Sequence, residues 1–272
     1  MTGRPAAACG VDLGGSWLRA VVLQGRSRRT ARRKVAPGET PERALRSVLR
    51  GLQLRRVDRL VIGARGCWLA SEKAALRRRL LGLSRRVAVV SDIELAHLAA
   101  FSGGPGVLVA AGTGSAAFGR DAAGRRARAG GFGPLLGDEG SSFWIGRRWL
   151  RASRDEDVRA FAKRPDAVRA VAALARGVLR RASTDRRARR IVREACGELA
   201  KLAVRAASRL RFRGPVPLSW AGGLFQDAAF RAEFLRSLSL EETCFSPRPP
   251  ACAPELAAAV FQDKFGRIMA KP

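Results

Sequence analysis

Two segments of the chain share a pattern that limits the folds it can adopt: an apolar strand, a tight turn of glycine and hydroxyl residues, and a second strand. The first segment, residues 7–25, joins AACGV to LRAVVLQG through DLGGS. The second segment, residues 106–121, joins GVLVAA to AAFGRD through GTGS. Both patterns predict antiparallel hairpins. Since the same device opens two halves of the chain, we expect two lobes of similar design.

Strands and helices alternate along the remaining sequence, which predicts an α/β fold. We predict helices over 41–52, 71–83, 139–152 and 227–238, an arginine-rich helical stretch over 156–213, and strands over 58–64, 86–92, 126–131 and 216–225. The segment SGGPG at 102–106 is typical of a hinge. It divides an N-terminal lobe, 1–104, from a C-terminal lobe, 105–272, with a terminal helix over 254–272 that could pack back on the first lobe.

The net charge of +29 would attract nucleic acid or an anionic membrane without specificity. Of the 52 basic residues, 46 are arginines, and they are spread along nearly every predicted helix. The aromatic residues that stack on bases are not interleaved with them, and tyrosine is absent. An arginine-rich usage across the proteome explains the charge as well. We therefore expect no specific nucleic acid and no membrane as partners, and an arginine-driven nucleic-acid binder remains the weaker alternative.

The predicted compartment is the cytoplasm. No apolar run approaches the ~20 residues that cross a bilayer, and the N-terminus lacks the layout of an export signal. The five cysteines are an odd number and form no C-x-x-C pair, so we expect free thiols in a reducing environment.

The turn DLGGS has the residues of a phosphate-binding turn. Gly14 and Gly15 permit positive φ and let a phosphate approach the amides, Ser16 adds a hydroxyl, and Asp12 can hold Mg²⁺ through water. The simpler alternative is a common hairpin turn in which Asp12 caps its own backbone.

The turn GTGS repeats this design. Gly112 and Gly114 leave space, while Thr113 and Ser115 supply hydroxyls beside free amides. An ordinary reversal needs none of these features, whereas an anion uses all of them. Two such turns, one in each half, suggest the phosphates of one nucleotide held in a cleft between the lobes.

Three further motifs stand where α/β sheets bind ligands. Asp92 follows an apolar strand and is either a general base or a residue at the start of a helix. The loop GGFGPLLGDEGS at 130–141 surrounds Asp138 and Glu139 with glycines and suits a small polar ligand, although the two acids could be first-turn charges. Gly222 and Gly223 follow a strand, where a flat nucleobase could lie against the backbone.

The single histidine, His97, and Trp68, Trp144, Trp149 and Trp220 are first expected to be packing residues.

The order of these motifs resembles the BadF/BadG/BcrA/BcrD ATPase family, which includes N-acetylglucosamine kinase. DLGGS, VVSD at 89–92, AGTGS, GGFGPLLGDEGS and AGGLF at 221–225 carry the resemblance, and the fourth is its most specific part. The resemblance implies two ribonuclease H-like lobes of the actin-like ATPase fold, with an ATP cleft between them.

The resemblance also implies roles for individual residues. Asp12, Gly14, Gly15 and Ser16 would form the first phosphate motif, with Mg²⁺ on Asp12 through water, and Gly112, Thr113, Gly114 and Ser115 the second. Asp92 would be the catalytic base, Gly222 and Gly223 the adenosine motif, and Gly131, Phe132, Gly133 and Asp138 the sugar-contacting loop. The implied reaction is transfer of the ATP γ-phosphoryl group to the hydroxyl of an amino sugar such as N-acetylglucosamine or glucosamine, with lobe closure excluding water.

The sequence departs from the family pattern in three places. Phe132 replaces the usual tryptophan, Ser91 precedes Asp92 where asparagine is usual, and no asparagine is present to hold the amino sugar. The alternative function is an ATP-hydrolysing activator of a partner protein without sugar kinase activity. Members of that branch hold an iron–sulfur cluster between subunits, and no cysteine here adjoins GTGS or GGFGP. We therefore expect a small-molecule sugar as the partner, with a homodimer as a possible assembly.

Overall fold

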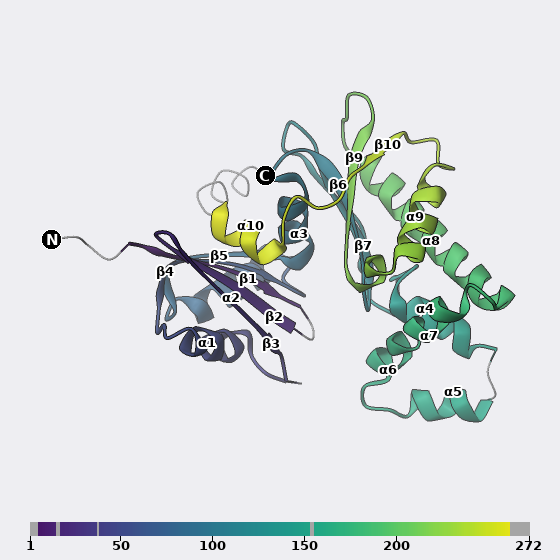
Figure 1. The fold of residues 1–272 in the computed structure, drawn as a ribbon, viewed down its shortest axis with the longest axis horizontal. Coiled ribbons are helices and arrows are strands. Elements are labelled where there is room, and N and C mark those ends of the chain that lie inside the picture. Colours follow the sequence, from purple (N-terminus) through teal and green to yellow (C-terminus); the bar gives the residue numbers. More distant parts are fainter. Residues whose placement is uncertain (1–4, 15–16, 37, 153–154, 262–272) are drawn as a thin grey trace. The chain divides into compact units, whose positions relative to one another are not determined.

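The computed structural model describes residues 5–14, 17–36, 38–152 and 155–261. The contacts within the chain define two units: unit 1 is Met1–Gly104 with Pro250–Pro272, and unit 2 is Pro105–Pro249. The second unit therefore ends before the terminal helix rather than at residue 272. Figure 1 shows the elements of each unit.

Unit 1 is a five-stranded sheet covered by helices on both faces (Figure 1). Its elements are β1 (Ala7–Leu13), β2 (Trp17–Gln24), β3 (Ser27–Lys34), α1 (Pro41–Gly51), β4 (Val57–Ala64), α2 (Ala70–Leu80), β5 (Ser84–Ser91), α3 (Asp92–Phe101) and α10 (Pro254–Val260). The strand order is β3-β2-β1-β4-β5, in which β2 is antiparallel to β1 and β3, while β4 is parallel to β1 and β5.

The alternation of side chains along β1 and β4 divides the core of unit 1 into two layers. Cys9, Val11 and Leu13 join the cluster formed with α1 and α2, while Val61 joins the cluster formed with α3 and α10. Gly10 lies on the second face, where a Cβ atom would come within 2.1 Å of the Glu255 carbonyl oxygen of α10. Glycine at this position therefore lets α10 pack directly on β1, and the same alternation puts Asp12 on the face that α3 and α10 cover.

Unit 2 repeats the design of the first sheet. Its elements are β6 (Gly106–Ala111), β7 (Ser115–Arg120), β8 (Arg126–Gly130), α4 (Ser142–Leu150), α5 (Asp155–Ala162), α6 (Ala167–Ala173), α7 (Ala175–Arg181), α8 (Arg186–Ala207), β9 (Val216–Ala221), the 3₁₀ helix η1 (Gly223–Gln226), α9 (Ala228–Leu238) and β10 (Phe245–Pro247). The order is β8-β7-β6-β9-β10, again with two antiparallel pairs followed by two parallel ones. The core is one cluster in which α8 is central, because α8 presents a continuous row of alanine, leucine and isoleucine to the sheet.

The prediction of an α/β fold in which each half begins with a hairpin is confirmed. Two strands, β3 and β10, were not predicted. β3 reads SRRTARRK and is half-exposed along its length, so no apolar alternation marks it. It forms by pairing with β2 at the edge of the sheet, and Arg32 stacks on Trp17 of β2 at 4.0 Å. β10 has only three residues and pairs in parallel with β9.

Two predicted boundaries differ from the structure. The stretch predicted as helical over 156–213 is divided among four helices, α5 to α8. The strand predicted over 216–225 ends at Ala221, because Gly222 takes a φ of +103° and turns the chain into η1.

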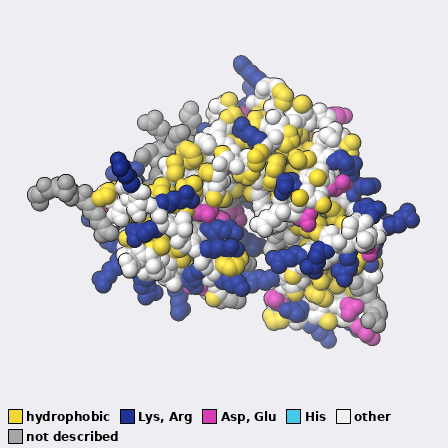
Figure 2. Space-filling model, viewed as in Figure 1, with side chains coloured by type: hydrophobic (Ala, Val, Ile, Leu, Met, Phe, Trp, Pro, Cys, Tyr) yellow, Lys and Arg dark blue, Asp and Glu magenta, His cyan; other side chains and the backbone are white. Residues whose placement is uncertain are grey.

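Basic side chains are spread over the face shown in Figure 2, on both units, rather than collected in one patch. The five cysteines are free thiols, and burial raises the pKa of Cys9 to about 12. No helix in the described part of the chain is both long and apolar enough to cross a membrane.

Candidate functional site

Asp12 is a largely buried carboxylate near the end of β1, with 14% of its side chain exposed. Its partner across the β1/β2 hairpin is Arg19, whose guanidinium donates to the Asp12 carboxylate at 3.0 Å. Burial raises the pKa of Asp12 to about 6; the charge and hydrogen bond of Arg19 lower it, and the negative charges of Glu255 and Asp92 raise it further. Asp12 thus stands in a group of acidic side chains that includes the predicted base.

Asp92 is the first residue of α3, and the surrounding residues fix that position. Ser91 is the N-cap, and its hydroxyl accepts from the Glu94 amide while the Glu94 carboxylate accepts from the Ser91 amide at 2.8 Å. Lys73 of α2 donates to Glu94 at 2.7 Å. Both sequence interpretations of Asp92 are therefore compatible: it begins a helix, and it is half-buried close to Asp12.

Glu255 is a third carboxylate of this group, and the sequence analysis did not identify it. It lies in the first turn of α10, and its Oε2 atom is buried with no hydrogen-bond partner among the described residues. An unpartnered buried carboxylate oxygen is costly unless a ligand satisfies it. Glu255 comes from the far end of the sequence, so only the packing of α10 on β1 could have found it.

The first phosphate motif is described in part. The Gly14 amide donates to the Trp17 carbonyl at 3.0 Å and closes the hairpin, whereas Gly15 and Ser16 lie outside the described residues.

The second motif, Gly112–Ser115, is built into the start of α4. The amides of Ser142 and Phe143 donate to the carbonyls of Gly112 and Thr113 at 2.8 and 3.3 Å, and the Ser115 hydroxyl donates to the Glu139 carbonyl at 2.6 Å. The tip and the loop after β8 therefore form one rigid piece.

The prediction of free amides at this tip is correct for two positions and wrong for two. The Gly112 amide donates to the Gly114 carbonyl, and the Ser115 amide donates to Asp138. The amides of Thr113 and Gly114 have no acceptor within the described residues. A Cβ atom added at Gly112 would meet nothing within 4 Å. Two free amides beside an open glycine form a place where an anion can approach the backbone.

Asp138 has a structural partner in addition to its predicted role. Its Oδ1 accepts from the Ser115 amide at 3.2 Å, and a Cβ at Gly114 would lie 2.7 Å from Oδ2. Asp138 is 7% exposed and takes a φ of +63°, a conformation that aspartate tolerates better than most residues. The carboxylate thus holds the tip of the hairpin, and Gly114 is required for that contact.

The predicted sugar-contacting loop adjoins the same tip. A Cβ added at Gly131 would lie 3.1 Å from the Cβ of Ala116, and Arg128 donates to the Gly131 carbonyl at 2.5 Å. Gly133 has a φ of +83° and open space beside it. Phe132 is 70% exposed and presents its ring to solvent, with the Arg128 guanidinium 6.0 Å from the ring. An exposed ring and an open glycine suit contact with a polar, flat ligand.

The two glycines of the predicted adenosine motif have different roles. At Gly222 a Cβ would lie 2.2 Å from the Ala111 carbonyl oxygen, so the close approach of β9 to β6 requires glycine there. Gly223 is exposed and a Cβ would meet nothing within 4 Å. Gly222 therefore lets the backbone of β9 lie close to that of β6 beside the Gly112 tip. Gly223 leaves its backbone uncovered by side chains.

The structure thus gathers the predicted residues in two sets. Asp12 and Asp92 meet in unit 1, and Gly112–Ser115, Gly131–Gly133, Asp138 and Gly222 meet in unit 2. His97 is buried with its ring centroid 4.8 Å from that of Phe101, which agrees with its interpretation as a packing residue. No group of three or more His, Cys, Asp or Glu side chains in the described residues is arranged to ligate a metal directly.

Comparison with known proteins agrees with this organisation. The model of the BadF/BadG/BcrA/BcrD ATPase family matches residues 9–262. An N-acetylmuramic acid/N-acetylglucosamine kinase from Clostridium acetobutylicum is 35% identical over 105 residues, which cover 38% of this chain and 34% of that protein. The match thus spans about a third of the length of this curated relative.

Two solved structures share the fold over nearly the whole chain. A candidate N-acetylglucosamine kinase from Chromobacterium violaceum superposes with a TM-score of 0.72 at 22% identity, covering 95% of this chain and 99% of the other. A glucokinase of the ROK family from Streptomyces griseus, in complex with glucose and AMPPNP, gives 0.58 at 18% identity, covering 95% and 99%. The prediction of a two-lobed actin-like ATPase fold is confirmed. With the family match over most of the chain, the repeated sheet and the paired motifs have one explanation: the chain belongs to the BadF/BadG/BcrA/BcrD ATPase family.

Proposed function

We propose that the protein transfers the γ-phosphoryl group of ATP to a hydroxyl of an amino sugar such as N-acetylglucosamine or glucosamine. The observation that carries this proposal is the position of Asp92, fixed at the start of α3 and close to the buried Asp12. A hydroxyl acceptor needs a base, which Asp92 can supply, and the phosphates need a cation, which Asp12 can hold through water.

Asp92 is the general base in this proposal. Its carboxylate accepts the proton of the sugar hydroxyl while the hydroxyl oxygen bonds to the γ-phosphorus. The bond between the γ-phosphorus and the oxygen that bridges it to the β-phosphate breaks, and ADP leaves. The hydrogen bonds of Ser91, Glu94 and Lys73 hold the helix start, so the base keeps its position through the reaction.

The nucleotide is bound by backbone groups in this proposal. The free amides of Thr113 and Gly114 and the Thr113 hydroxyl donate to phosphate oxygens, and the turn after Asp12 contributes Gly14 with Gly15 and Ser16. Gly222 and Gly223 give the adenosine a bare surface. The sugar lies against Gly131, Phe132 and Gly133, with Asp138 supporting that loop from beneath.

Asp12 suits Mg²⁺ held through water. Direct coordination is not supported, because the described acids do not form a ligand cluster. Water held on the Asp12 carboxylate would give the hard oxygen surroundings that Mg²⁺ prefers, and the Glu255 carboxylate would add negative charge nearby. When bound, the ion supplies positive charge that neutralises the phosphate oxygens.

ADP release with Mg-ATP tests the proposal across a panel of N-acetylglucosamine, glucosamine, N-acetylmuramic acid, glucose and no sugar. We expect one amino sugar to raise ADP release far above the blank, and Asp92→Asn to abolish that increase. Asp166→Asn is the matched control, since Asp166 is an exposed acid paired with Arg164 outside both sets of site residues. ADP release that no sugar changes would favour the activator and contradict the kinase.

A further inference from the structure

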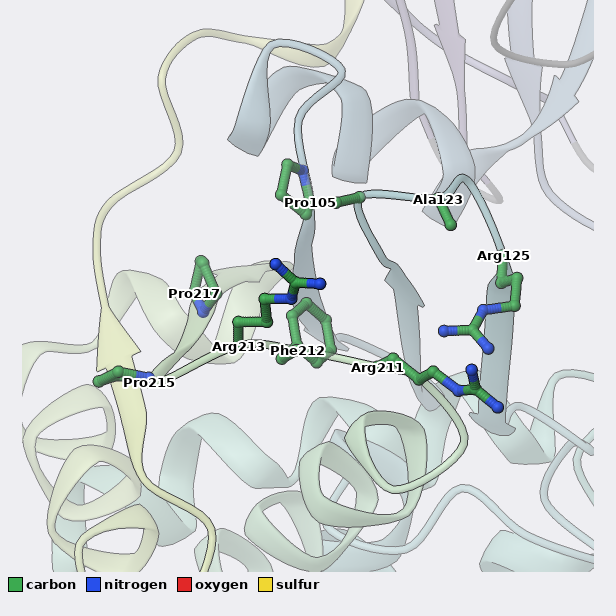
Figure 3. Close-up of a pocket in the computed structure, with 9 residues that line it drawn as sticks. Pro105, Ala123, Arg125, Arg211, Phe212, Arg213, Pro215 and Pro217 are labelled. Carbon is green, nitrogen blue, oxygen red and sulfur yellow. The ribbon is translucent and has the colours of Figure 1, made fainter.

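A pocket lies in unit 2 at the end of the sheet opposite to the Gly112 tip. Its volume is about 660 Å³, which is ample for a small organic ligand. Three segments of unit 2 line it: the start of β6, the turn between β7 and β8, and the segment between α8 and β9 (Figure 3). Since β6 runs from Pro105 toward Gly112, the length of this strand, about 20 Å, separates the pocket from the phosphate-binding tip.

The walls of the pocket are apolar on one part and cationic on another. Pro105, Phe212, Pro215 and Pro217 supply flat apolar surface, together with the two alanines of the β7/β8 turn. Among the described residues, the charged side chains that line the pocket are those of three arginines, Arg125, Arg211 and Arg213, with no acid. In Figure 3 the guanidinium groups of Arg125 and Arg211 point toward one another, and the Arg213 side chain lies beside the Phe212 ring and points toward Pro105.

One buried acid beneath the pocket neutralises part of this charge. Asp121 accepts from the Arg125 guanidinium at 2.7 Å and from the Arg211 amide at 3.2 Å. Burial raises the pKa of Asp121, but the hydrogen bonds from Arg125 and from the Arg211 amide outweigh it and lower the pKa, so the acid stays ionised. Asp121 fixes Arg125 and the backbone of Arg211 in place and leaves the pocket with a net charge of two positive guanidinium groups.

The side chains of Arg211 and Arg213 have no hydrogen bond or ion pair within the described residues. Unpaired arginines are common in this chain, because basic residues outnumber acids by 29, and Arg211 and Arg213 differ from most of them in lining an apolar cavity. Two unpaired guanidinium groups at an apolar cavity combine the fork that recognises a phosphate with a surface on which a ring can stack.

We propose that this pocket binds a small phosphomonoester whose body is flat and apolar. The phosphate pairs with Arg211 and Arg213, and the ring lies against Phe212 and the prolines. The site does not depend on the proposed kinase activity, because none of its residues belongs to either set of predicted site residues.

Titration calorimetry with 1-naphthyl phosphate tests the proposal on the full chain at physiological ionic strength, where screening limits general attraction to the +29 charge. We expect saturable binding that saturating AMPPNP does not displace, and at least tenfold weaker binding of inorganic phosphate. The double variant Arg211→Gln with Arg213→Gln should weaken 1-naphthyl phosphate at least tenfold. Both side chains are exposed, so the fold should not change.

The matched control is Arg176→Gln with Arg180→Gln, which removes the same charge from exposed arginines of α7 and should change binding by less than twofold. Equal weakening by both double variants would show general electrostatic attraction and overturn the proposal. Displacement by AMPPNP would place the ligand at the nucleotide motifs instead. Inorganic phosphate or 1-naphthoate binding as tightly as 1-naphthyl phosphate would overturn the assignment of the ligand class.

Discussion

The two sheets have the same strand order, yet the ends of their central strands differ: acidic side chains surround the end of β1, and backbone groups surround the end of β6. β1 of unit 1 and β6 of unit 2 each stand at the centre of a sheet and lead into a glycine turn. At the end of β1 the neighbours are α3 and α10, which bring Asp92 and Glu255 toward Asp12. At the end of β6 the neighbours are α4 and the loop before it, which bring hydrogen-bonding backbone and a single acid. The helices and loops that pack against the end of a strand therefore determine which chemical groups gather there.

The acids differ in energy as well as in number. Asp138 has its carboxylate satisfied by the Ser115 amide, so it stabilises the hairpin tip. Burial raises the pKa of Asp12, the negative charges of Glu255 and Asp92 raise it further, and Glu255 Oε2 has no hydrogen-bond partner among the described residues. Such a group weakens the fold, and its retention fits a reactive role. The comparison therefore predicts that acids of unit 1 affect turnover and that the acid of unit 2 affects stability.

The largest effect is expected when Asp92 and Asp138 are each replaced by asparagine in separate variants. Asp92→Asn should lower kcat by about 10²–10⁴, the contribution of a general base, while the dissociation constant for ATP changes by less than about twofold. Asp138→Asn should lower the free energy of unfolding by about 1–2 kcal/mol, because the buried charged acceptor of the Ser115 amide becomes a neutral one. Steady-state kinetics, nucleotide titration and denaturation of both variants check this. A kcat loss in Asp138→Asn without a loss of stability would contradict the predicted difference between the acids of unit 1 and the acid of unit 2.

The next effect compares two glycines of one turn. Gly112→Ala places a methyl group in open space where the phosphate would approach, so ATP binding should weaken about tenfold and stability should hold within about 0.5 kcal/mol. Gly114→Ala drives a methyl group against Asp138 and should destabilise the protein by about 1–3 kcal/mol. Titration with AMPPNP and thermal denaturation separate the two outcomes. Unaltered AMPPNP binding by Gly112→Ala would exclude this tip from the phosphate site.

The smallest effect concerns pH. The pKa of Asp12 in the folded protein is about 6, above the ordinary value of 3.8. The folded protein thus favours protonated Asp12, and this contribution to stability is complete below about pH 4 and is lost as pH rises through 6. Mg²⁺ needs the ionised form, so its apparent affinity should fall up to about tenfold from pH 7 to pH 5.

The Mg²⁺ dependence of ADP release between pH 5 and pH 8 measures this loss. Glu255→Gln removes a negative charge that raises the pKa of Asp12, so the loss should move to lower pH. Glu242→Gln, an exposed acid of unit 2, is the control and should leave the profile in place. A profile that Glu255→Gln does not move would separate Glu255 from the metal site.

The sequence was sufficient where the signals are local. Apolar alternation and glycine turns predicted both hairpins, and the start of α3 at Asp92 agrees with one of the two interpretations that the sequence offered for this acid. β3 was missed because an edge strand needs no apolar face, and Ala31 is its only apolar residue. Edge strands of this kind are fixed by the partner strand, which a local pattern does not contain.

The site was predicted unevenly for a related reason. Asp12, Asp92 and the GTGS turn are recognisable within a few residues of their own strands. Glu255 is brought to Asp12 by a helix from the end of the chain, and the bond between Asp138 and the Ser115 amide joins two loops. The free amides of the turn were overestimated because the Gly112 amide bonds within the turn and the Ser115 amide bonds to Asp138, which is distant in the sequence.

The most direct test of the account is the fate of the γ-phosphoryl group. ATP labelled with ³²P at the γ position is incubated with Mg²⁺, the protein and the sugar that most raises ADP release, or N-acetylglucosamine if none does, and the products are separated. We predict label on a sugar phosphate with the wild type, none with Asp92→Asn, and nucleotide binding retained in both. Label found only in inorganic phosphate, with and without sugar, would contradict the kinase and identify an ATP-hydrolysing protein instead.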